Sequence, residues 1–374
     1  MSSIKVLQVL STLNLGGAES RMMDIYRNID YKICQFDFVI LKDDRQYYED
    51  EIRRRGGEIF KLSSPRIAGI VSHIQQLREI IRKGKYKVVH SHTSYHSGLV
   101  MFAAYLEGVP IRITHARTAG TNHCDYKTLI MAYIGKFLIK MFSTDRLAVS
   151  KEAGLFLFKN LRFKIIPNTI DSDAYLYVNG CKEEACNVLG IPWDKTVIGQ
   201  VGRLDKMKNH EFTIKWFKQF QQRKKDTILL FIGDGDLRNE LEIKVNELGI
   251  SEHVLFTGRR DDLKVVIHAI DVMIIPSIYE GFPGVVLEAQ ASGIPIVESD
   301  SITSETDLGL GLIERCSLKS QYSEWNKAII KSINKNRVCL DKIRNAFDKA
   351  GFRIDHVVKQ IMEIYCREKN MIHK

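Results

Sequence analysis

Short apolar segments rich in valine, isoleucine and leucine alternate along the chain with longer amphipathic segments. A short, continuous apolar run is typical of a strand buried on both faces of a parallel sheet, and the longer segments are typical of helices. In the first half of the chain, the segments that predict strands are 4–10, 35–41, 58–62, 87–92, 111–115, 146–150 and 164–167. Helical patterns fall between them, for instance at residues 71–83 and 98–106. This alternation predicts an α/β fold with a doubly wound parallel sheet.

A second series of the same kind follows residues 168–195, a polar stretch that we interpret as an interdomain connection. Its predicted strands begin at residue 196 and include 228–234, 253–258 and 271–277. Its predicted helices include 211–222, 237–248 and 284–292, and the tail at 321–371 also has helical periodicity. A chain of 374 residues is long for one hydrophobic core, so we expect two domains that use the same architecture twice.

The composition, with 45% hydrophobic and 27% charged residues, is ordinary for a globular protein. No apolar run is long enough to predict a transmembrane helix, and the chain enters its first strand without the pattern of a signal peptide. The seven cysteines are scattered and have no zinc-like spacing. We therefore interpret them as reduced thiols in a cytoplasmic protein.

Positive charge is concentrated in the first half. Residues 1–170 contain 26 Lys and Arg against 15 Asp and Glu, whereas residues 171–374 contain 29 against 30. A basic half favours an anionic partner, such as a phospholipid surface or a pyrophosphate-linked acceptor. Nucleic acid would also suit the charge, but the sequence lacks aromatic–basic interleaving and any known nucleic-acid module, so we expect no nucleic-acid partner.

The candidate chemistry is centred on residues 274–300, where a predicted strand is followed by a turn, a helix and a second strand. Glu280 precedes the turn, and Glu288 lies within the helix. The backbone amides of residues 281–285 stand at the helix N-terminus, where they lack intrahelical partners and can bind an anion or a hydroxyl-rich ligand. The alternative is a structural turn flanked by two surface glutamates.

The spacing of Glu280 and Glu288, with Gly-Phe-Pro-Gly between them and Ala-Ser-Gly-Ile-Pro-Ile-Val after them, resembles the donor-sugar motif of family 4 retaining glycosyltransferases. Within that family, the chain is most similar to bacterial exopolysaccharide and capsule transferases. The resemblance implies the GT-B fold, in which two Rossmann-like domains face each other across a cleft. It also implies a metal-independent hexosyltransferase that has no cofactor and uses a nucleoside diphosphate sugar, expected to be a UDP-sugar, as co-substrate.

The resemblance also divides the chain. Residues 165–171 are similar to the segment that ends the first domain of family members, which implies an acceptor-binding domain at 1–170 and a nucleotide-sugar-binding domain at 171–353. A last helix at about 354–370 is expected to pack back on the first domain. The implied acceptor is a glycan or a polyprenyl-diphosphate-linked oligosaccharide.

Individual residues acquire roles from the same resemblance. Glu280 and His115 are the implied catalytic residues, and the implied donor-binding residues are Gly16, Gly17, Arg203, Lys208, Arg259, Gly281, Phe282, Pro283, Gly284, Val285 and Glu288. Arg203 and Lys208 would bind the pyrophosphate, because arginine supplies a fork of donors and lysine a point charge. Lys206 is the alternative to Lys208, since Met-Lys-Asn stands where relatives more often have Lys-Gly. Arg259 would lie near the base, and Glu288 would accept hydrogen bonds from the ribose.

The glycine turn and the histidine of the first half leave alternatives open. Gly16 and Gly17 lie between a predicted strand and a predicted helix, a position that suits a phosphate but often needs glycine for conformational reasons alone. By the resemblance, His115 would contact the donor sugar. Its alternative is a hydrogen-bonded histidine at the end of a strand.

Other histidines raise the question of a metal site. We interpret His90 and His92, which close the preceding predicted strand, as structural. A metal site built from His90, His92, His96 and His123 lacks an acidic ligand at a suitable spacing. No metal is therefore predicted.

Residues 126–142 predict a largely apolar helix. Its apolar face consists of Ile130, Tyr133, Ile134, Phe137 and Met141, and Lys127, Lys136 and Lys140 are interspersed. The helix could lie on the cytoplasmic face of the inner membrane with its lysines at headgroup level, or it could be a buried helix of the first domain. The sequence leaves both interpretations open.

Two other functional classes remain. A sugar-nucleotide 2-epimerase shares the two-domain architecture, but the motif around Glu280 fits that class poorly. A non-catalytic sugar-nucleotide-binding partner of another transferase would normally have lost ligands that are present here. The sugar, the acceptor, the linkage and the oligomeric state are not determined by the sequence.

Overall fold

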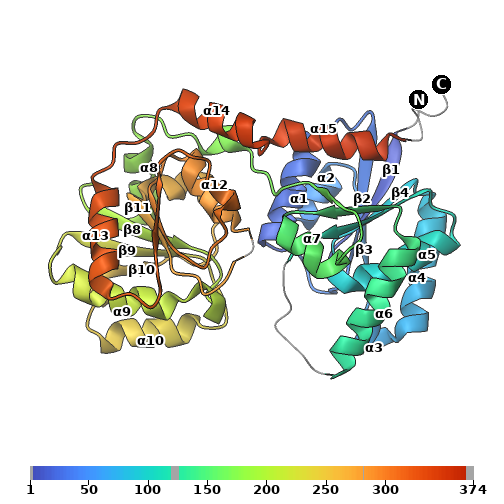
Figure 1. The fold of residues 1–374 in the computed structure, drawn as a ribbon, viewed down its shortest axis with the longest axis horizontal. Helices are drawn as coiled ribbons and strands as arrows, with labels where there is room; N and C mark the ends of the chain where they lie inside the picture. Colours follow the sequence, from blue (N-terminus) through green and yellow to red (C-terminus); the bar gives the residue numbers. More distant parts are fainter. Residues whose placement is uncertain (1–2, 119–125, 281, 368–374) are drawn as a thin grey trace. The chain divides into compact units, whose positions relative to one another are not determined.

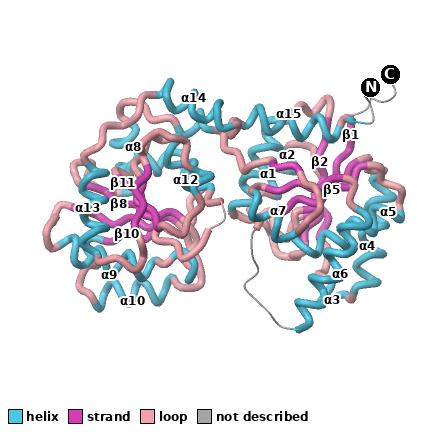
Figure 2. Tube along the Cα trace, in the orientation of Figure 1, coloured by secondary structure: helices cyan, strands magenta, loops and turns pink. Residues whose placement is uncertain are grey.

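The computed structural model describes residues 3–118, 126–280 and 282–367. The chain forms two compact units: unit 1 comprises Met1–Thr169 with Ile354–Lys374, and unit 2 comprises Ile170–Arg353. In each unit the strands form one sheet, and helices cover both of its faces (Figure 1, Figure 2). Both units are therefore Rossmann-like, as the alternating pattern predicts.

Unit 1 has a seven-stranded parallel sheet. Its strands are β1 (Ile4–Val9), β2 (Cys34–Ile40), β3 (Ile59–Lys61), β4 (Val88–Ser91), β5 (Ile111–Ala116), β6 (Asp145–Ala148) and β7 (Lys164–Ile165). Its helices are α1 (Gly17–Asn28), α2 (Glu49–Arg54), α3 (Pro65–Ala68), α4 (Ile70–Gly84), α5 (Ser97–Leu106), α6 (Tyr126–Phe142), α7 (Lys151–Phe158) and α15 (Ile354–Tyr365), with a 3-10 turn η1 (Ser94–His96). The strand order is β3-β2-β1-β4-β5-β6-β7, so the winding direction reverses between β1 and β4. Ligands of such sheets bind beyond the carboxyl ends of the strands at this reversal.

Unit 2 has a six-stranded parallel sheet. Its strands are β8 (Thr196–Val201), β9 (Thr227–Ile232), β10 (Val254–Phe256), β11 (Val272–Ile275), β12 (Ile296–Ser299) and β13 (Ile313–Cys316). Its helices are α8 (Cys181–Leu189), α9 (His210–Gln221), α10 (Arg238–Glu247), α11 (Leu263–Val266), α12 (Gly284–Ala291), α13 (Tyr322–Ile333) and α14 (Leu340–Ala350), and its 3-10 turns are η2 (Ser172–Tyr175), η3 (Lys206–Lys208), η4 (Ser251–His253), η5 (Ile267–Ala269) and η6 (Ser304–Thr306). The strand order is β10-β9-β8-β11-β12-β13, and here the winding reverses between β8 and β11.

Two elements of unit 2 differ from the sequence prediction. Helix α8 lies inside the polar stretch that we interpreted as a connection; it buries Ala185 and Cys186 and is otherwise polar, so its apolar period is weak. Strand β13 was not predicted because its sequence, Ile-Glu-Arg-Cys, has charged residues at its centre. It pairs only with β12 at the edge of the sheet, where charged side chains are common.

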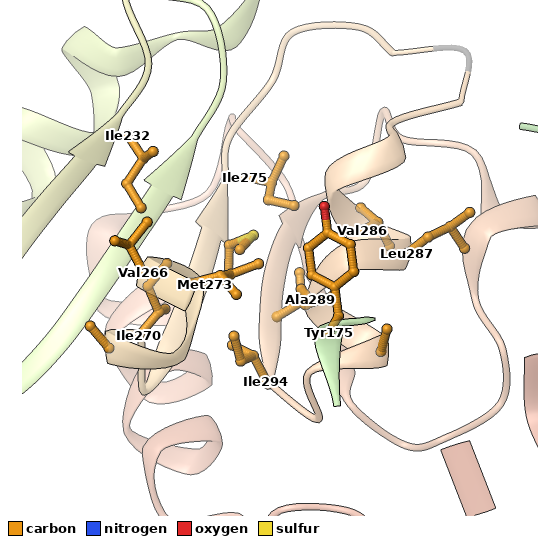
Figure 3. Close-up of a cluster of buried hydrophobic side chains, with 14 of the residues drawn as sticks. Tyr175, Ile232, Val266, Ile270, Met273, Ile275, Val286, Leu287, Ala289 and Ile294 are labelled. Carbon is orange, nitrogen blue, oxygen red and sulfur yellow. The ribbon is translucent and has the colours of Figure 1, made fainter. Parts of the chain in front are cut away.

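Helix α12 is held against β11 by apolar side chains (Figure 3). Met273 and Ile275 of β11 share a cluster with Val286 and Ala289 of α12, and all four side chains are at most 3% exposed. Burying such side chains contributes about 1.5–3 kcal/mol each for the larger ones. This packing sets the N-terminus of α12 at the carboxyl end of β11.

The loops that follow β8 and β9 approach each other closely at Gly233. This residue has φ of +144°, and a Cβ atom there would lie 1.9 Å from the carbonyl oxygen of Gly202. Only glycine fits such a contact. The loop after β8, which carries the candidate pyrophosphate ligands, is therefore supported by the neighbouring strand end.

Candidate active site

The loop between β8 and α9 holds Lys208 in a defined position. The Asp205 carboxylate accepts a hydrogen bond from the backbone N–H of Lys208 at 3.1 Å. Asn209 adopts a left-handed conformation with φ of +57°, and its side-chain amide donates to the carbonyl of Pro276 at 3.1 Å. The Gln200 amide donates to the carbonyl of Lys208 at 2.8 Å. These bonds tie the loop to the end of β11.

Lys208 and Glu280 form an ion pair at that end. Lys208 Nζ lies 2.7 Å from Glu280 Oε1, and the two side chains are 22% and 12% exposed. Ser277 Oγ donates to the same carboxylate oxygen at 2.6 Å. Because a partly buried lysine has three donors in one ammonium group, Lys208 can bind Glu280 and an anionic ligand at the same time. Lys208 and Glu280 are 72 positions apart in the sequence. The family resemblance assigns both to the donor site, and the structure brings them into contact.

The other candidate cations are more exposed. The Arg203 side chain is 62% exposed, and its ion-pair partner among the described residues is Asp236, at 3.4 Å, which is itself 87% exposed. Lys206 and Arg259 are also exposed. An exposed guanidinium with a long, weak ion pair can reorient toward a ligand at little cost. The half-buried, oriented lysine of this loop is Lys208 and not Lys206.

The N-terminus of α12 leaves room for a ligand. The backbone N–H of Val286 donates to the carbonyl of Pro283, whereas the first amides of a helix, here those of Gly284 and Val285, lack intrahelical partners. A Cβ atom on Gly284 would meet no atom of the described residues within 4 Å. The ring of Phe282 instead packs edge-on against Phe352 at 5.6 Å.

The remaining residues of the motif have different surroundings. Glu288 is 6% exposed and therefore buried within α12. Gly281, a predicted donor ligand, lies outside the described residues. A third carboxylate, Glu298 of β12, was not predicted: it is fully buried, and its Oε1 accepts from Arg315 Nε at 3.0 Å. Burial raises the pKa of Glu298 to about 7; Arg315 opposes this shift, and Asp307 and Glu280 add smaller increases.

In unit 1, the predicted glycine turn joins β1 to α1. Gly16 precedes the helix in an extended conformation, and a Cβ atom there would lie 2.4 Å from Glu19 Oε2. The Glu19 carboxylate also accepts from Thr12 Oγ1 at 2.8 Å. A Cβ atom on Gly17 would have open space within 4 Å. Space in this turn is therefore restricted at Gly16, by the Glu19 side chain, and open at Gly17.

His115 lies at the end of β5 and takes part in a histidine cluster. Its Nδ1 is 3.2 Å from His90 Nε2, and the two rings are stacked with an interplanar angle of 4°. His92 lies beside both rings and accepts from Arg117 Nε at 3.1 Å. His90 and His115 are 0% and 1% exposed. Within the described residues, His115 Nε2 has no hydrogen-bond partner of acceptable geometry.

Burial is the main influence on the charge of this cluster. It lowers the pKa of His90, His92 and His115 well below the usual range, and the nearby Arg117 lowers each further. The backbone of Ile166 opposes part of the effect on the pKa of His115. The three histidines are therefore neutral at physiological pH.

The cluster has the spacing of a metal site but not its electrostatics. One ring nitrogen from each of His90, His92 and His115 lies within 4.8 Å of the others. However, the Arg117 guanidinium donates to His92 and carries a positive charge that would repel a cation. The metal set considered from the sequence also differs, because His96 lies outside this group, with its ring against that of Tyr95 at an interplanar angle of 35°, and His123 lies outside the described residues. We describe the cluster as a hydrogen-bonded network.

Helix α6 presents an exposed apolar stripe. Side chains that are 39–77% exposed are Tyr126, Leu129, Ile130, Tyr133, Ile134, Phe137 and Met141. The opposite face is held close to η1, since a Cβ atom on Gly135 would lie 2.1 Å from the carbonyl oxygen of Tyr95. Of the two interpretations that the sequence leaves open, the buried helix does not hold for this face. No helix in the described ranges combines the length and the apolar character that a membrane crossing requires.

Sequence reasoning missed part of this arrangement. It treated His90 and His92 as separate from His115, although parallel strand ends place them together. It did not single out Gln8 or Tyr365, which bond to the histidines. Gln8 carries a weak signal, because it is a polar residue within an apolar strand. Tyr365 carries none, since it reaches the cluster from a helix 275 residues away from His90.

Two Rossmann-like units are the architecture of the GT-B class, and two family models match the chain. The model described as "Glycosyl transferases group 1" matches residues 182–349, and "Glycosyltransferase Family 4" matches residues 15–174. EpsF of Bacillus subtilis, which is named as a glycosyltransferase, is 33% identical over 371 residues, 97% of each chain. The chain therefore belongs to the family 4 glycosyltransferases, which confirms the resemblance predicted from the Glu280 motif.

Two other relatives and one solved structure are similar over most of their lengths. CapH of Staphylococcus aureus, a capsular polysaccharide biosynthesis glycosyltransferase, is 25% identical over 97% of this chain and 98% of its own. An Escherichia coli enzyme named as a UDP-Gal:α-D-GlcNAc-diphosphoundecaprenol α-1,3-galactosyltransferase is 26% identical over 77% of each chain. The crystal structure of Anabaena HepE in complex with UDP and glucose superposes with a TM-score of 0.77, covering 96% of this chain and 98% of that one at 18% identity. This last likeness supports the fold alone.

Proposed function

We propose that the chain is a retaining, metal-independent glycosyltransferase. It would transfer a hexose or N-acetylhexosamine from a UDP-sugar to a lipid-linked acceptor of surface polysaccharide synthesis. The observation that carries the proposal is the Lys208–Glu280 pair at 2.7 Å, located at the strand ends of unit 2 and followed directly by α12. A cation, a carboxylate and free helix amides are the groups that a diphosphate joined to a sugar requires.

The charge on the leaving diphosphate is the main demand on the site. Lys208 and the backbone amides of Gly284 and Val285 would stabilise the charge on the diphosphate. The exposed Arg203 side chain would reorient to contact the diphosphate. Preorganised donors of this kind do the work that a divalent metal does in other transferases. The prediction that no metal is needed rests on these donors, which would take the place of a divalent metal.

Retention at the anomeric carbon is what the family resemblance implies, and Glu280 has a supporting role in it. Its Oε1 accepts from both Lys208 and Ser277, which suits a carboxylate that orients sugar hydroxyls. In the proposed step, the acceptor oxygen bonds to the anomeric carbon on the face from which the diphosphate departs. The bond from that carbon to the β-phosphate oxygen breaks, and a phosphate oxygen takes the proton of the acceptor hydroxyl.

The donor nucleotide and the acceptor class come from the relatives. The E. coli relative is named for UDP-galactose and a diphosphoundecaprenol acceptor, and HepE was crystallised with UDP and glucose. Glu288, buried on α12, would accept hydrogen bonds from the ribose, and Arg259 would lie near the base.

A thermal-shift screen against UDP, GDP, ADP and their common sugars tests the donor site. A ligand that binds only the folded protein raises its melting temperature by mass action. We expect stabilisation by UDP and a UDP-sugar, unchanged by EDTA and reduced by Glu288→Ala and Arg203→Ala. Transfer to a polyprenyl-diphosphate-linked sugar, with the anomeric configuration of the product read by NMR, tests retention. No shift with any nucleotide would favour the non-catalytic partner.

The exposed stripe of α6 favours contact with an anionic phospholipid surface. Beside it, Arg66 of α3 donates to Thr128 of α6 at 3.1 Å, which brings the exposed Ile67 (82%) and Val71 (70%) to the same region. Lys140 is exposed on the helix, and the surrounding half of the chain is basic. Lys136 does not contribute, because its ammonium donates to the carbonyl of Phe156 at 2.7 Å. Apolar side chains among positive charges are the pattern of a helix lying at a bilayer surface.

Vesicle sedimentation tests this contact. We expect the protein to sediment with vesicles that contain anionic phospholipid, and Phe137→Ser to weaken binding. The matched control is Ile243→Ser in unit 2, because the two side chains are 56% and 58% exposed. Equal binding by both variants, or binding independent of anionic lipid, would contradict the proposed surface.

A further inference from the structure

An unbroken series of hydrogen bonds joins Arg117 to His115 at the strand ends of unit 1. The bonds are Arg117 Nε to His92 Nδ1 (3.1 Å), His92 Nε2 to Gln8 Oε1 (3.0 Å), Gln8 Nε2 to Tyr365 Oη (3.0 Å), Tyr365 Oη to His90 Nδ1 (2.7 Å) and His90 Nε2 to His115 Nδ1 (3.2 Å). The members come from β1, the β4 end, the β5 end and α15. We call this series the histidine relay.

The direction of the relay follows from its first member. An arginine Nε–H can only donate, so His92 Nδ1 accepts, and neutral His92 must carry its proton on Nε2. That proton requires an acceptor, which fixes the amide of Gln8 with its oxygen toward His92 and its nitrogen toward Tyr365.

The second half of the relay is fixed in the same way. The hydroxyl of Tyr365 accepts from Gln8, so its single proton goes to His90 Nδ1. Neutral His90 then carries its proton on Nε2 and donates to His115 Nδ1. His115, also neutral, is left with its proton on Nε2.

Burial keeps the members in these protonation states. The pKa of each histidine lies well below its usual range, chiefly because of burial, and burial raises the pKa of Tyr365 above its usual range. His90, His92, His115 and Tyr365 therefore remain neutral. The donor and acceptor of one hydrogen bond in the relay can exchange only if those of the neighbouring bonds exchange as well.

The relay ends at Nε2 of His115, and the backbone of Ile166 approaches this ring without a hydrogen bond of acceptable geometry to Nε2. His115 is 1% exposed, and its Nε2 has no partner of acceptable geometry among the described residues. Nη2 of Arg117 is in the same situation. A buried N–H without a partner is rare and costs about 1–3 kcal/mol. A ligand oxygen would satisfy it.

We propose that the histidine relay locks His115 as the tautomer that is protonated on Nε2. The family resemblance already implies a contact between His115 and the donor sugar, and the relay adds that His115 makes this contact as an N–H donor to a hydroxyl oxygen. Gln8, His90 and Tyr365 are positioning residues, because they act through His115. His115 is accordingly a hydrogen-bond donor in the transfer reaction and not its general base. The second part of the proposal rests on the glycosyltransferase function proposed above; the tautomer does not.

Nitrogen NMR of protein labelled with ¹⁵N-histidine tests the tautomer directly, since protonated and unprotonated ring nitrogens have well separated shifts. In the unaltered protein we expect a proton on Nε2 of His115 and none on Nδ1, with the resonances assigned through His115→Gln. In Tyr365→Phe, which removes the donor to His90, we expect the second tautomer of both rings to appear. Tyr26→Phe is the matched control, because it removes a hydroxyl from a 0%-exposed tyrosine of the same core that does not touch the histidines.

Kinetics test the role in transfer. Loss of one neutral hydrogen bond corresponds to about fivefold in kcat/KM for the donor, which we expect for Tyr365→Phe relative to Tyr26→Phe, with the acceptor KM unchanged. Gln8→Glu is a second, isosteric variant in case Tyr365→Phe does not fold. Its carboxylate would accept the Tyr365 proton, reverse that bond and produce the same change in the His115 spectrum.

Each outcome decides one part of the proposal. A proton on Nδ1 of His115 in the unaltered protein, or identical spectra for the Tyr365 and Tyr26 variants, would overturn the relay. A changed spectrum with unchanged kinetics in an active enzyme would overturn the sugar contact and leave Nε2 with the backbone near Ile166. Absence of transfer with every donor would contradict the proposed function. The NMR spectra would still show which tautomer His115 adopts.

Discussion

The strand ends of the two units differ in the kind of polar group that they present. In unit 2, Lys208 and Glu280 are charged, paired and in contact with solvent, and Arg203 is largely exposed. In unit 1, His90 and His115 are neutral, buried and joined by hydrogen bonds. The same parallel-sheet architecture thus supports a site suited to an anion in one unit and a site suited to uncharged oxygens in the other.

The difference follows from burial. The side chains of Lys208 and Glu280 are 22% and 12% exposed, so each ion keeps part of its hydration and has the other as its partner, and a charged pair is tolerated in unit 2. At the fully buried strand ends of unit 1, a charged histidine would be costly, and the side chains satisfy each other as neutral donors and acceptors. Four predictions test this comparison.

The largest effect is expected from the charged site. Lys208→Ala should lower kcat by roughly 100- to 1,000-fold, because it removes an oriented donor to the leaving diphosphate. Lys206→Ala, which removes an exposed lysine of the same loop, should lower kcat by less than about threefold. Initial rates of nucleotide release measure both, and a larger loss in the Lys206 variant would reassign the pyrophosphate ligand.

Glu298 of β12 is fully buried, unlike the charged pair of its own unit, and it predicts an unusual pH dependence. Because burial raises the folded pKa of Glu298 to about 7, the folded protein holds a proton that the unfolded chain has lost, and stability should fall as pH rises from about 4.5 to about 7. The contribution is at most roughly 3 kcal/mol. Glu298→Gln should flatten thermal unfolding over this interval.

The control for Glu298 is a neighbouring carboxylate with the opposite shift. At Glu314, burial alone would raise the pKa, but Lys335 and Lys331 outweigh it and the pKa is lowered. Glu314→Gln should therefore remove stability that is present above the ordinary carboxylate pKa and lost in acid. Parallel pH profiles for the two variants would show that burial does not control Glu298.

A smaller effect is expected from the neutral site. His115→Ala should lower kcat/KM by about tenfold, since one hydrogen bond to a neutral oxygen and its buried surroundings are lost. His115→Gln should recover part of this loss because its side-chain amide also offers an N–H. A loss as large as that of Lys208→Ala would indicate that the histidine carries charge in the reaction, contrary to the comparison.

The smallest effect concerns exposure. Arg203→Ala should raise the donor KM by about three- to tenfold at low salt, and the difference from the unaltered enzyme should shrink as ionic strength rises, because an exposed cation is screened. The effect of His115→Ala should not depend on salt. Steady-state kinetics at two salt concentrations compare them, and a salt-independent Arg203 effect would indicate a buried contact.

Particular elements show how far the sequence can be interpreted. The Glu280 and Glu288 motif and the Gly-Arg-Leu segment were recognisable because each lies within a local strand–loop–helix pattern. The helix at residues 126–142 was predicted with its bounds, whereas which of its faces packs on unit 1 was not. Strand β13 and helix α8 were missed because only a few of their positions are buried.

The sequence by itself determined the periodic pattern that makes two parallel sheets, and the residue types around the donor motif, because both depend on neighbours close in the chain. Tertiary structure decided the partners: Lys208 with Glu280, and His115 with His90, Gln8 and Tyr365. It also decided which groups keep their charge, because burial depends on packing between distant segments. The sequence thus showed which chemical groups the protein has, and the fold showed which of them act together.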